Sequence, residues 1–143
     1  MTIRTKAIAT SFFVSLFTTA CIWPGDKNLN NEAMLTKASQ LTKLSTAVES
    51  TVRYKNPPAG LDEQGLLKIA TQHDPQLLEN FSDYKVRVLV MERHSAVLVC
   101  TKDGKRGLLE DAACTVAFDQ HLWKDANRPC EFTQDIKTAC PAP

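Results

Sequence analysis

The sequence has few residues of the kinds that catalytic and ligand-binding motifs require. It contains only five glycines in 143 residues, and none of them forms a glycine-rich loop for binding phosphate. The Gly-x-Ser-x-Gly, His-Glu-x-x-His and Cys-x-x-Cys motifs of hydrolases, zinc proteases and thiol oxidoreductases are also absent. The three histidines, His73, His94 and His121, have no sequence partner at catalytic spacing. We therefore expect a protein that is not an enzyme and has no cofactor.

The chain also lacks an excess of charge of either sign. Its 17 basic and 16 acidic residues give a net charge of +1. Proteins that bind nucleic acids usually carry a strong basic excess, so we expect no nucleic-acid partner. Hydrophobic residues at 43% and charged residues at 23% are typical of a soluble globular protein, and the length fits one domain. This composition excludes a disordered chain and a membrane protein with several spans.

Residues 1–20 have the pattern of an export signal. Arg4 and Lys6 form a short basic region, and an uncharged segment with an apolar run follows over residues 7–25. Threonines and serines dilute this run, whereas a transmembrane helix needs about 20 predominantly apolar residues. We therefore expect residues 1–20 to be a signal peptide that is removed on export.

The end of this segment, Thr18-Thr19-Ala20-Cys21, resembles the lipobox of bacterial lipoproteins, in which small residues precede a cysteine. The resemblance covers the first 21 residues. It implies that Cys21 is acylated, for example with palmitate, and becomes the mature N-terminus as a membrane anchor. Because Ile22 rather than aspartate follows, the sorting tendency of the family implies anchoring to the outer membrane, facing the periplasm. The alternative is cleavage by an ordinary signal peptidase, which would leave a soluble periplasmic or secreted protein.

The five cysteines favour the lipidated alternative. Cysteines of exported proteins usually pair, because the periplasm is oxidising. If Cys21 carries lipid, four cysteines remain for two bridges: Cys100, Cys114, Cys130 and Cys140. Four cysteines allow three pairings, and we expect the two shorter loops, Cys100 with Cys114 and Cys130 with Cys140. Because oxidised cysteines cannot bind a metal as thiolates, we expect no metal site.

Residues 21–30 show no apolar periodicity and are expected to form a tether to the membrane, followed by a single α+β domain over residues 31–143. An amphipathic helix is predicted over residues 31–54, and it is expected to pack on its own sheet rather than form a coiled coil. Its apolar face is expected to hold Met34, Leu35, Ala38, Leu41, Leu44, Ser45, Val48 and Val52. Lys37, Gln40, Lys43 and Glu49 are expected to lie outside that face.

Two short helices are predicted after this long helix. Pro57 and Pro58 end the long helix, and Asp62 then caps a first short helix. Asp74 and Pro75 begin the second, with the proline at the first helical position.

A three-stranded antiparallel meander is predicted next. Residues 84–91 alternate and are rich in β-branched side chains, which indicates a strand, and further strands are expected over residues 96–101 and 106–110. Asp103-Gly104 is a strong hairpin signal between the second and third strands. We expect the long helix on one face of the sheet, and the short helices or the disulfide-stapled C-terminal tail on the other.

Two functions from different classes remain open. The first is a non-enzymatic envelope lipoprotein, an accessory or assembly factor that binds a protein partner in secretion, pilus or cell-wall machinery. The second is a small exported inhibitor or immunity-type protein that blocks a lysozyme-like or toxin hydrolase. The basic hairpin turn, formed by Lys102, Lys105 and Arg106, is the candidate contact surface for an acidic partner or for lipid phosphates. Catalytic groups can also be assembled in space, so His94 beside the hairpin and His121 near Asp119 can still meet a carboxylate or serine that sequence order hides.

Overall fold

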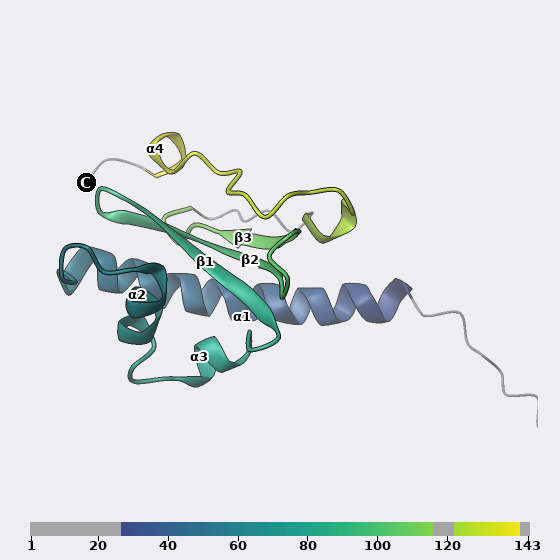
Figure 1. Cartoon of the computed structure of the whole chain (residues 1–143), viewed down its shortest axis with the longest axis horizontal. Helices are drawn as coiled ribbons and strands as arrows, with labels where there is room; N and C mark the ends of the chain where they lie inside the picture. The colour runs from purple at the N-terminus through teal and green to yellow at the C-terminus, as the bar shows by residue number, and fades with distance from the viewer. Residues whose placement is uncertain (1–26, 116–121, 141–143) are drawn as a thin grey trace, which may run out of the picture.

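The computed structural model describes residues 27–115 and 122–140, which form an α+β fold (Figure 1). The elements in chain order are α1 (Lys27–Tyr54), α2 (Glu63–Ala70), α3 (Gln76–Glu79), β1 (Tyr84–Met91), β2 (His94–Thr101), β3 (Gly107–Asp111), the short 3-10 helix η1 (Leu122–Lys124) and α4 (Ile136–Ala139). No helix among the described residues combines the length and the apolar character that a membrane span requires. The expected signal peptide and Cys21 lie outside the described residues.

The three strands form one antiparallel sheet in the order β1-β2-β3, so the predicted meander is confirmed. β2 begins at His94, two residues earlier than the sequence predicts, because the turn after β1 consists only of Glu92 and Arg93. Met91 pairs directly with His94 across this turn, and Glu92 has a positive φ of 58°. At the other end of β2, Cys100 pairs with Gly107, which is the register that a turn at Asp103-Gly104 requires.

Helix α1 covers one face of the sheet and contacts β2 and β3. Its inner side chains pack with Val86, Val88, Val97 and Val99 of the sheet to form the main core. The buried side chains that α1 contributes are Ala38, Leu41, Leu44, Val48 and Val52. The helix therefore packs on its own sheet.

Three details of α1 differ from the sequence-based expectation. The helix begins at Lys27, so residues 27–30 belong to its first turn rather than to the tether. Leu35 is 52% exposed, and its neighbour Met34 packs against the core instead. Glu49 is only 6% exposed, because its carboxylate binds groups on β2. The prediction that Glu49 lies outside the packed face of α1 is therefore wrong.

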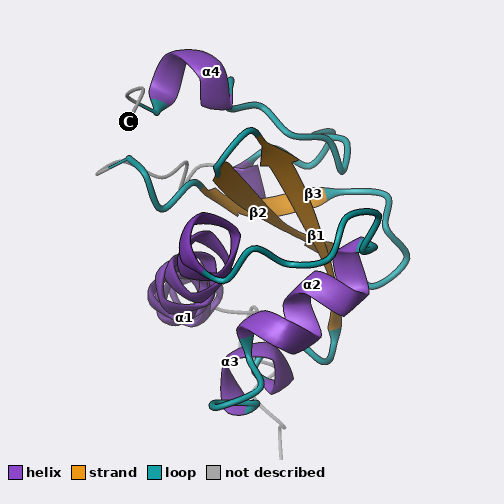
Figure 2. Ribbon diagram, turned by 90° about the vertical axis from the view of Figure 1, so that its left-hand side faces the viewer, coloured by secondary structure: helices purple, strands orange, loops and turns teal. Residues whose placement is uncertain are grey.

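Helices α2 and α3 lie on the same side of the sheet as α1, as Figure 2 shows. Asp62 caps α2 as predicted, with its side chain accepting a hydrogen bond from the backbone N–H of Gly65. Leu66 and Leu67 of α2 are buried in the main core, and Glu63 accepts hydrogen bonds from β1. The opposite face of the sheet is therefore left to the C-terminal tail.

The tail crosses this opposite face in a mostly irregular conformation (Figure 2). Its path is fixed where Cys130 donates a backbone hydrogen bond to Lys105 and where the fully buried Glu110 accepts from Thr133 and Gln134. Two small apolar clusters form where the tail packs on β2 and on the chain at the end of β3. The tail contributes to them the side chains of Leu122, Phe132 and Ile136.

The predicted disulfide pairing is wrong. Cys100 is bonded to Cys130 and Cys114 to Cys140, so each bridge joins the sheet region to the tail. In the predicted pairing, the bridge between Cys130 and Cys140 would have closed a loop within the tail. The bridge between Cys100 and Cys114 would have joined the end of β2 to the chain just after β3. Because the tail crosses the sheet, Cys130 lies beside β2 and Cys140 reaches the end of β3. The position of the tail in space therefore decides the pairing.

Candidate functional site

The turn between β1 and β2 brings His94 to the carboxylate of Glu49 on α1. His94 is the first residue of β2, and its Nδ1 lies 2.8 Å from Oε1 of Glu49. Ser95 donates two hydrogen bonds to the other carboxylate oxygen, from its backbone N–H at 2.6 Å and from its hydroxyl at 2.9 Å. All three residues are buried. This cluster links α1 to the end of the sheet that lies farther from the N-terminal end of α1.

The carboxylate of Glu49 decides which nitrogen of His94 carries hydrogen. A carboxylate only accepts hydrogen bonds, so the ring nitrogen that faces it, Nδ1, is the donor. In the neutral imidazole this leaves a lone pair on Nε2. That atom is buried and has no hydrogen-bond partner among the described residues. An unpartnered buried polar atom is uncommon in folded proteins and requires an explanation.

Two sulfurs, which can bind a metal as thiolates, lie close to the ring of His94. One ring nitrogen of His94 and the Sγ atoms of Cys114 and Cys140 lie within 4.8 Å of one another. Cys114 follows β3 and is half-buried, whereas Cys140 follows α4 and is 6% exposed. The sequence separates His94 from Cys140 by 46 positions, so no spacing motif could have revealed this group.

A cavity of about 280 Å³ opens beside the cluster. His94, Ile136 and Cys140 form part of its wall, and the exposed side chains of Glu92 and Lys137 line it as well. The site therefore combines an oriented imidazole, a disulfide and a route for small solutes.

The arrangement is not a serine-histidine-acid relay. In such a relay the histidine takes a proton from the serine hydroxyl, so Nε2 must face that oxygen. Here Ser95 donates its hydroxyl to Glu49, the same carboxylate that holds His94. The cluster orients the ring of His94 without providing it with a hydroxyl nucleophile.

The basic turn predicted as a contact surface lies at the other end of β2. Lys102 and Lys105 are exposed, and each has an acidic neighbour, Asp83 at 3.8 Å and Asp103 at 3.9 Å respectively. Arg106 is half-buried and forms a β-bridge with Pro129 of the tail, so it contributes less to the surface.

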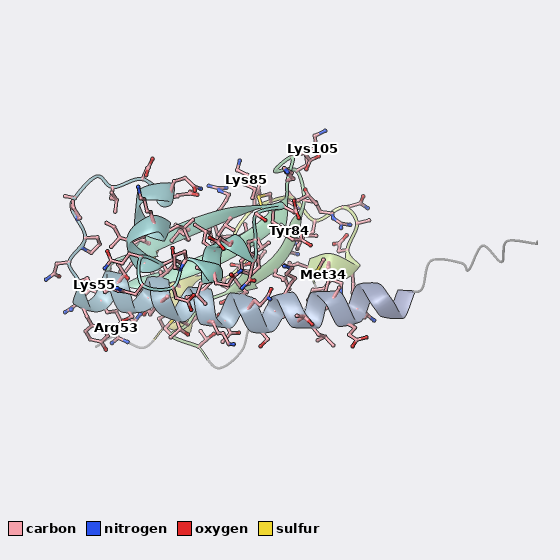
Figure 3. The ribbon with its side chains drawn as sticks, turned by 90° about the horizontal axis from the view of Figure 1, so that it is seen from below. Met34, Arg53, Lys55, Tyr84, Lys85 and Lys105 are labelled. Carbon is pink, nitrogen blue, oxygen red and sulfur yellow. A yellow bond between two sulfur atoms is a disulfide. The ribbon has the colours of Figure 1, made fainter. Side chains whose placement is uncertain are left out.

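A further basic residue, Lys85 of β1, lies next to this turn. Its side chain passes beside Gly104. Figure 3 shows Lys85 on the same side of the molecule as Lys105. The pairing of β1 with β2 puts Lys85 opposite Cys100, and no local sequence signal joins it to the turn. The hydrogen bond from Thr101 and the backbone N–H of Lys105 lower the pKa of Asp103, which keeps an acidic group among these lysines.

Of the two other histidines, the structure describes only His73, and it does not join either group of residues. His73 is exposed and lies next to Gln72, 2.9 Å from its side-chain amide. His121 lies outside the described residues.

Comparisons with models of known protein families, with curated proteins and with solved structures each find no match to this chain. Its site is therefore interpreted from its own chemistry.

Proposed function

We propose that this chain is a non-enzymatic lipoprotein of the bacterial cell envelope, anchored to the outer membrane through Cys21, whose domain binds a protein partner. The observation that carries the proposal is the pairing of the cysteines. Four of the five cysteines are paired within the domain, which leaves Cys21 as the remaining cysteine of the chain. Two structural disulfides are typical of an oxidising compartment, and a lone cysteine after an export signal fits acylation.

The buried cluster supports binding rather than turnover. Among the described histidines, packing brings His94 to a carboxylate, yet Glu49 and Ser95 use their hydrogen bonds to hold it and the end of α1 together. A hydrolase would need a nucleophile or an activated water at Nε2, and the neighbouring sulfurs are joined in a disulfide. We therefore assign Glu49 a positioning role in the fold.

The surface proposed for the partner is the end of the domain that lies away from the anchor. A 28-residue helix is about 42 Å long, so α1 separates its N-terminal end from the β1–β2 turn at its C-terminal end (Figure 1). Three large apolar side chains are exposed toward this far end: Tyr54 at 71%, Val90 at 45% and Leu61 at 37%. Exposed aromatic and aliphatic side chains are common at protein interfaces. We define these three residues as the distal surface.

The basic turn lies apart from the distal surface, and we assign it a different contact. Figure 3 shows Lys105 and Lys85 away from Arg53 and Lys55, which lie at the C-terminal end of α1. The turn is therefore remote from the distal surface. We propose that Lys102 and Lys105 contact lipid phosphates rather than the protein partner, because basic side chains near an anionic surface are attracted to it.

Acylation of Cys21 is tested first. Intact-protein mass spectrometry should show an N-terminal acylated cysteine, and Cys21→Ser should release the protein into the soluble periplasmic fraction with both bridges intact. A wild-type protein without acyl chains would refute the lipoprotein proposal. Acylated protein in the inner membrane would refute only the outer-membrane placement.

Partner binding is tested by crosslinking in the intact envelope. A photoreactive residue at position 54 or 90 should give the same single crosslinked species, and one at the exposed Lys43 in the middle of α1 should not. Val90→Asp should reduce the yield from position 54, because a charge in an apolar contact must be desolvated. Equal labelling at position 43 would contradict the distal surface, and a foreign hydrolase as the crosslinked species would favour an inhibitor.

A further inference from the structure

The ring of His94, whose Nε2 has no partner among the described residues, and the sulfurs of Cys114 and Cys140 beside it could bind the same metal ion. Nitrogen from imidazole and sulfur from thiolate are the ligands that Zn²⁺ prefers in proteins. His94, Cys114 and Cys140 are the residues among those described whose ligand atoms converge in this way. While the two cysteines are bonded to each other, they cannot act as thiolates.

We propose that opening of the Cys114–Cys140 bridge converts this group into a Zn²⁺ site with ligands from His94, Cys114 and Cys140. The reductant is an external dithiol, which becomes a disulfide while both cysteines become thiols. Binding of the ion then releases one proton from each thiol, so that two thiolates and the neutral imidazole hold Zn²⁺. This inference does not rest on lipidation of Cys21 or on the distal surface.

Glu49 supplies the support that metal-binding histidines usually have. Such histidines donate their other ring N–H to a carboxylate, which fixes the orientation of the ring. Glu49 accepts from Nδ1 of His94 at 2.8 Å and is itself held by Ser95. His94 is 6% exposed, its Nε2 has no partner among the described residues, and one of its ring nitrogens lies within 4.8 Å of both sulfurs. Glu49 therefore holds the ring of His94 in place beside the sulfurs before an ion binds.

The surroundings allow the ion to enter and the bridge to be opened selectively. The cavity of about 280 Å³ is lined by His94 and Cys140, which are two of the three residues that would hold the ion. Cys114 is partly exposed, whereas Cys100 in the other bridge is fully buried in β2. An attacking thiolate therefore reaches the Cys114–Cys140 bridge more easily.

The test uses the exported chain carrying Cys21→Ser, which removes the fifth thiol and keeps the domain cysteines. Mild treatment with a dithiol should open the Cys114–Cys140 bridge first, giving two free thiols that peptide mapping assigns to Cys114 and Cys140. After removal of the reductant under anaerobic conditions, the protein should bind one Zn²⁺ per chain. Co²⁺ in place of Zn²⁺ should give the absorption bands of sulfur-to-metal charge transfer, and the oxidised protein should give none.

Variants separate this site from adventitious binding by two thiols. His94→Gln should weaken binding of Zn²⁺ at least tenfold, and Glu49→Gln should weaken it about 10- to 100-fold through the orientation of the ring. His73→Gln, which changes an exposed histidine, should have no effect. Circular dichroism of each reduced variant verifies that it is folded. The measurement on the reduced wild-type protein does not depend on any substitution at the proposed ligands.

The proposal is overturned if the selectively reduced wild-type protein binds no Zn²⁺. It is also overturned if His94→Gln binds Zn²⁺ as tightly as the wild type, because the imidazole is then not a ligand. Binding of equal strength by the oxidised protein would likewise exclude the thiolates.

Discussion

Glu110 is expected to be the residue on which docking of the C-terminal tail depends most. Its side chain is fully buried at the end of the sheet, and its carboxylate accepts hydrogen bonds from two backbone N–H groups and one hydroxyl of the tail. The donors are the N–H and hydroxyl of Thr133 and the N–H of Gln134, at 2.6–3.0 Å. We expect Glu110→Gln, which conserves the volume and removes the charge, to lower the free energy of unfolding.

The magnitude follows from the three donors. Hydrogen bonds to a charged group contribute about 1.5–3 kcal/mol each, roughly twice the value for neutral partners. Replacing three charge-assisted bonds by neutral ones therefore costs about 3 kcal/mol before other effects. The variant no longer buries a charge, and Thr133 is exposed enough for water to replace part of the loss. We expect a net decrease of about 1–3 kcal/mol in the free energy of unfolding.

Urea unfolding followed by tryptophan fluorescence measures this change. Both disulfides hold the tail to the sheet in the variant, so the protein stays folded and the transition stays measurable. Glu131→Gln is the matched control, because Glu131 lies in the same tail and is exposed. It should change the free energy by less than about 0.5 kcal/mol. If Glu110→Gln costs no more than this control, the carboxylate does not fix the tail.

Two further predictions concern the pH dependence and the bridges. Burial raises the pKa of Asp111 above its ordinary value of 3.8, with a partly opposing hydrogen bond from Ser45, so the folded state holds this proton more tightly than the unfolded state. The contribution of Asp111 to stability therefore falls as the pH rises from below 3.8 through the raised pKa. Asp111→Asn should stabilise the protein more at pH 7 than at pH 3, which urea unfolding at both pH values measures. An equal effect at both pH values would contradict this prediction. Peptide mapping without reduction should recover Cys100 linked to Cys130, and changing both to alanine should cost about 4 kcal/mol by the chain-entropy estimate for a loop of 30 residues. Recovery of Cys130 linked to Cys140 would contradict the observed pairing.

The elements that could be predicted from the sequence depend on neighbours along the chain. The alternation from Tyr84 to Met91 gives β1, and Asp103-Gly104 sets the hairpin in which Cys100 meets Gly107. Asp62 caps α2 through a hydrogen bond to a residue three positions away. Each of these interactions closes within a few residues, so the local pattern contains the information that decides it.

The candidate site required the tertiary structure, because its parts come from separate elements. Glu49 looks like an exposed helical acid in sequence, and only the turn of the hairpin 45 positions later brings His94 to it. Glu110 ends up buried for a similar reason, since its partners arrive from a tail whose sequence has no clear periodicity.

The sequence by itself determined the α+β class, the antiparallel meander and the cysteines available for pairing, because periodicity, caps and turn residues act over short distances. Only the tertiary structure decided that Cys100 pairs with Cys130 and Cys114 with Cys140. Loop entropy favours short loops by amounts that grow slowly with loop length, about 0.6 kcal/mol for each doubling. Burial of the tail on the sheet and the hydrogen bonds to Glu110 outweigh so small a preference. The same packing brings the ring of His94 beside two sulfurs that are remote from it in the chain.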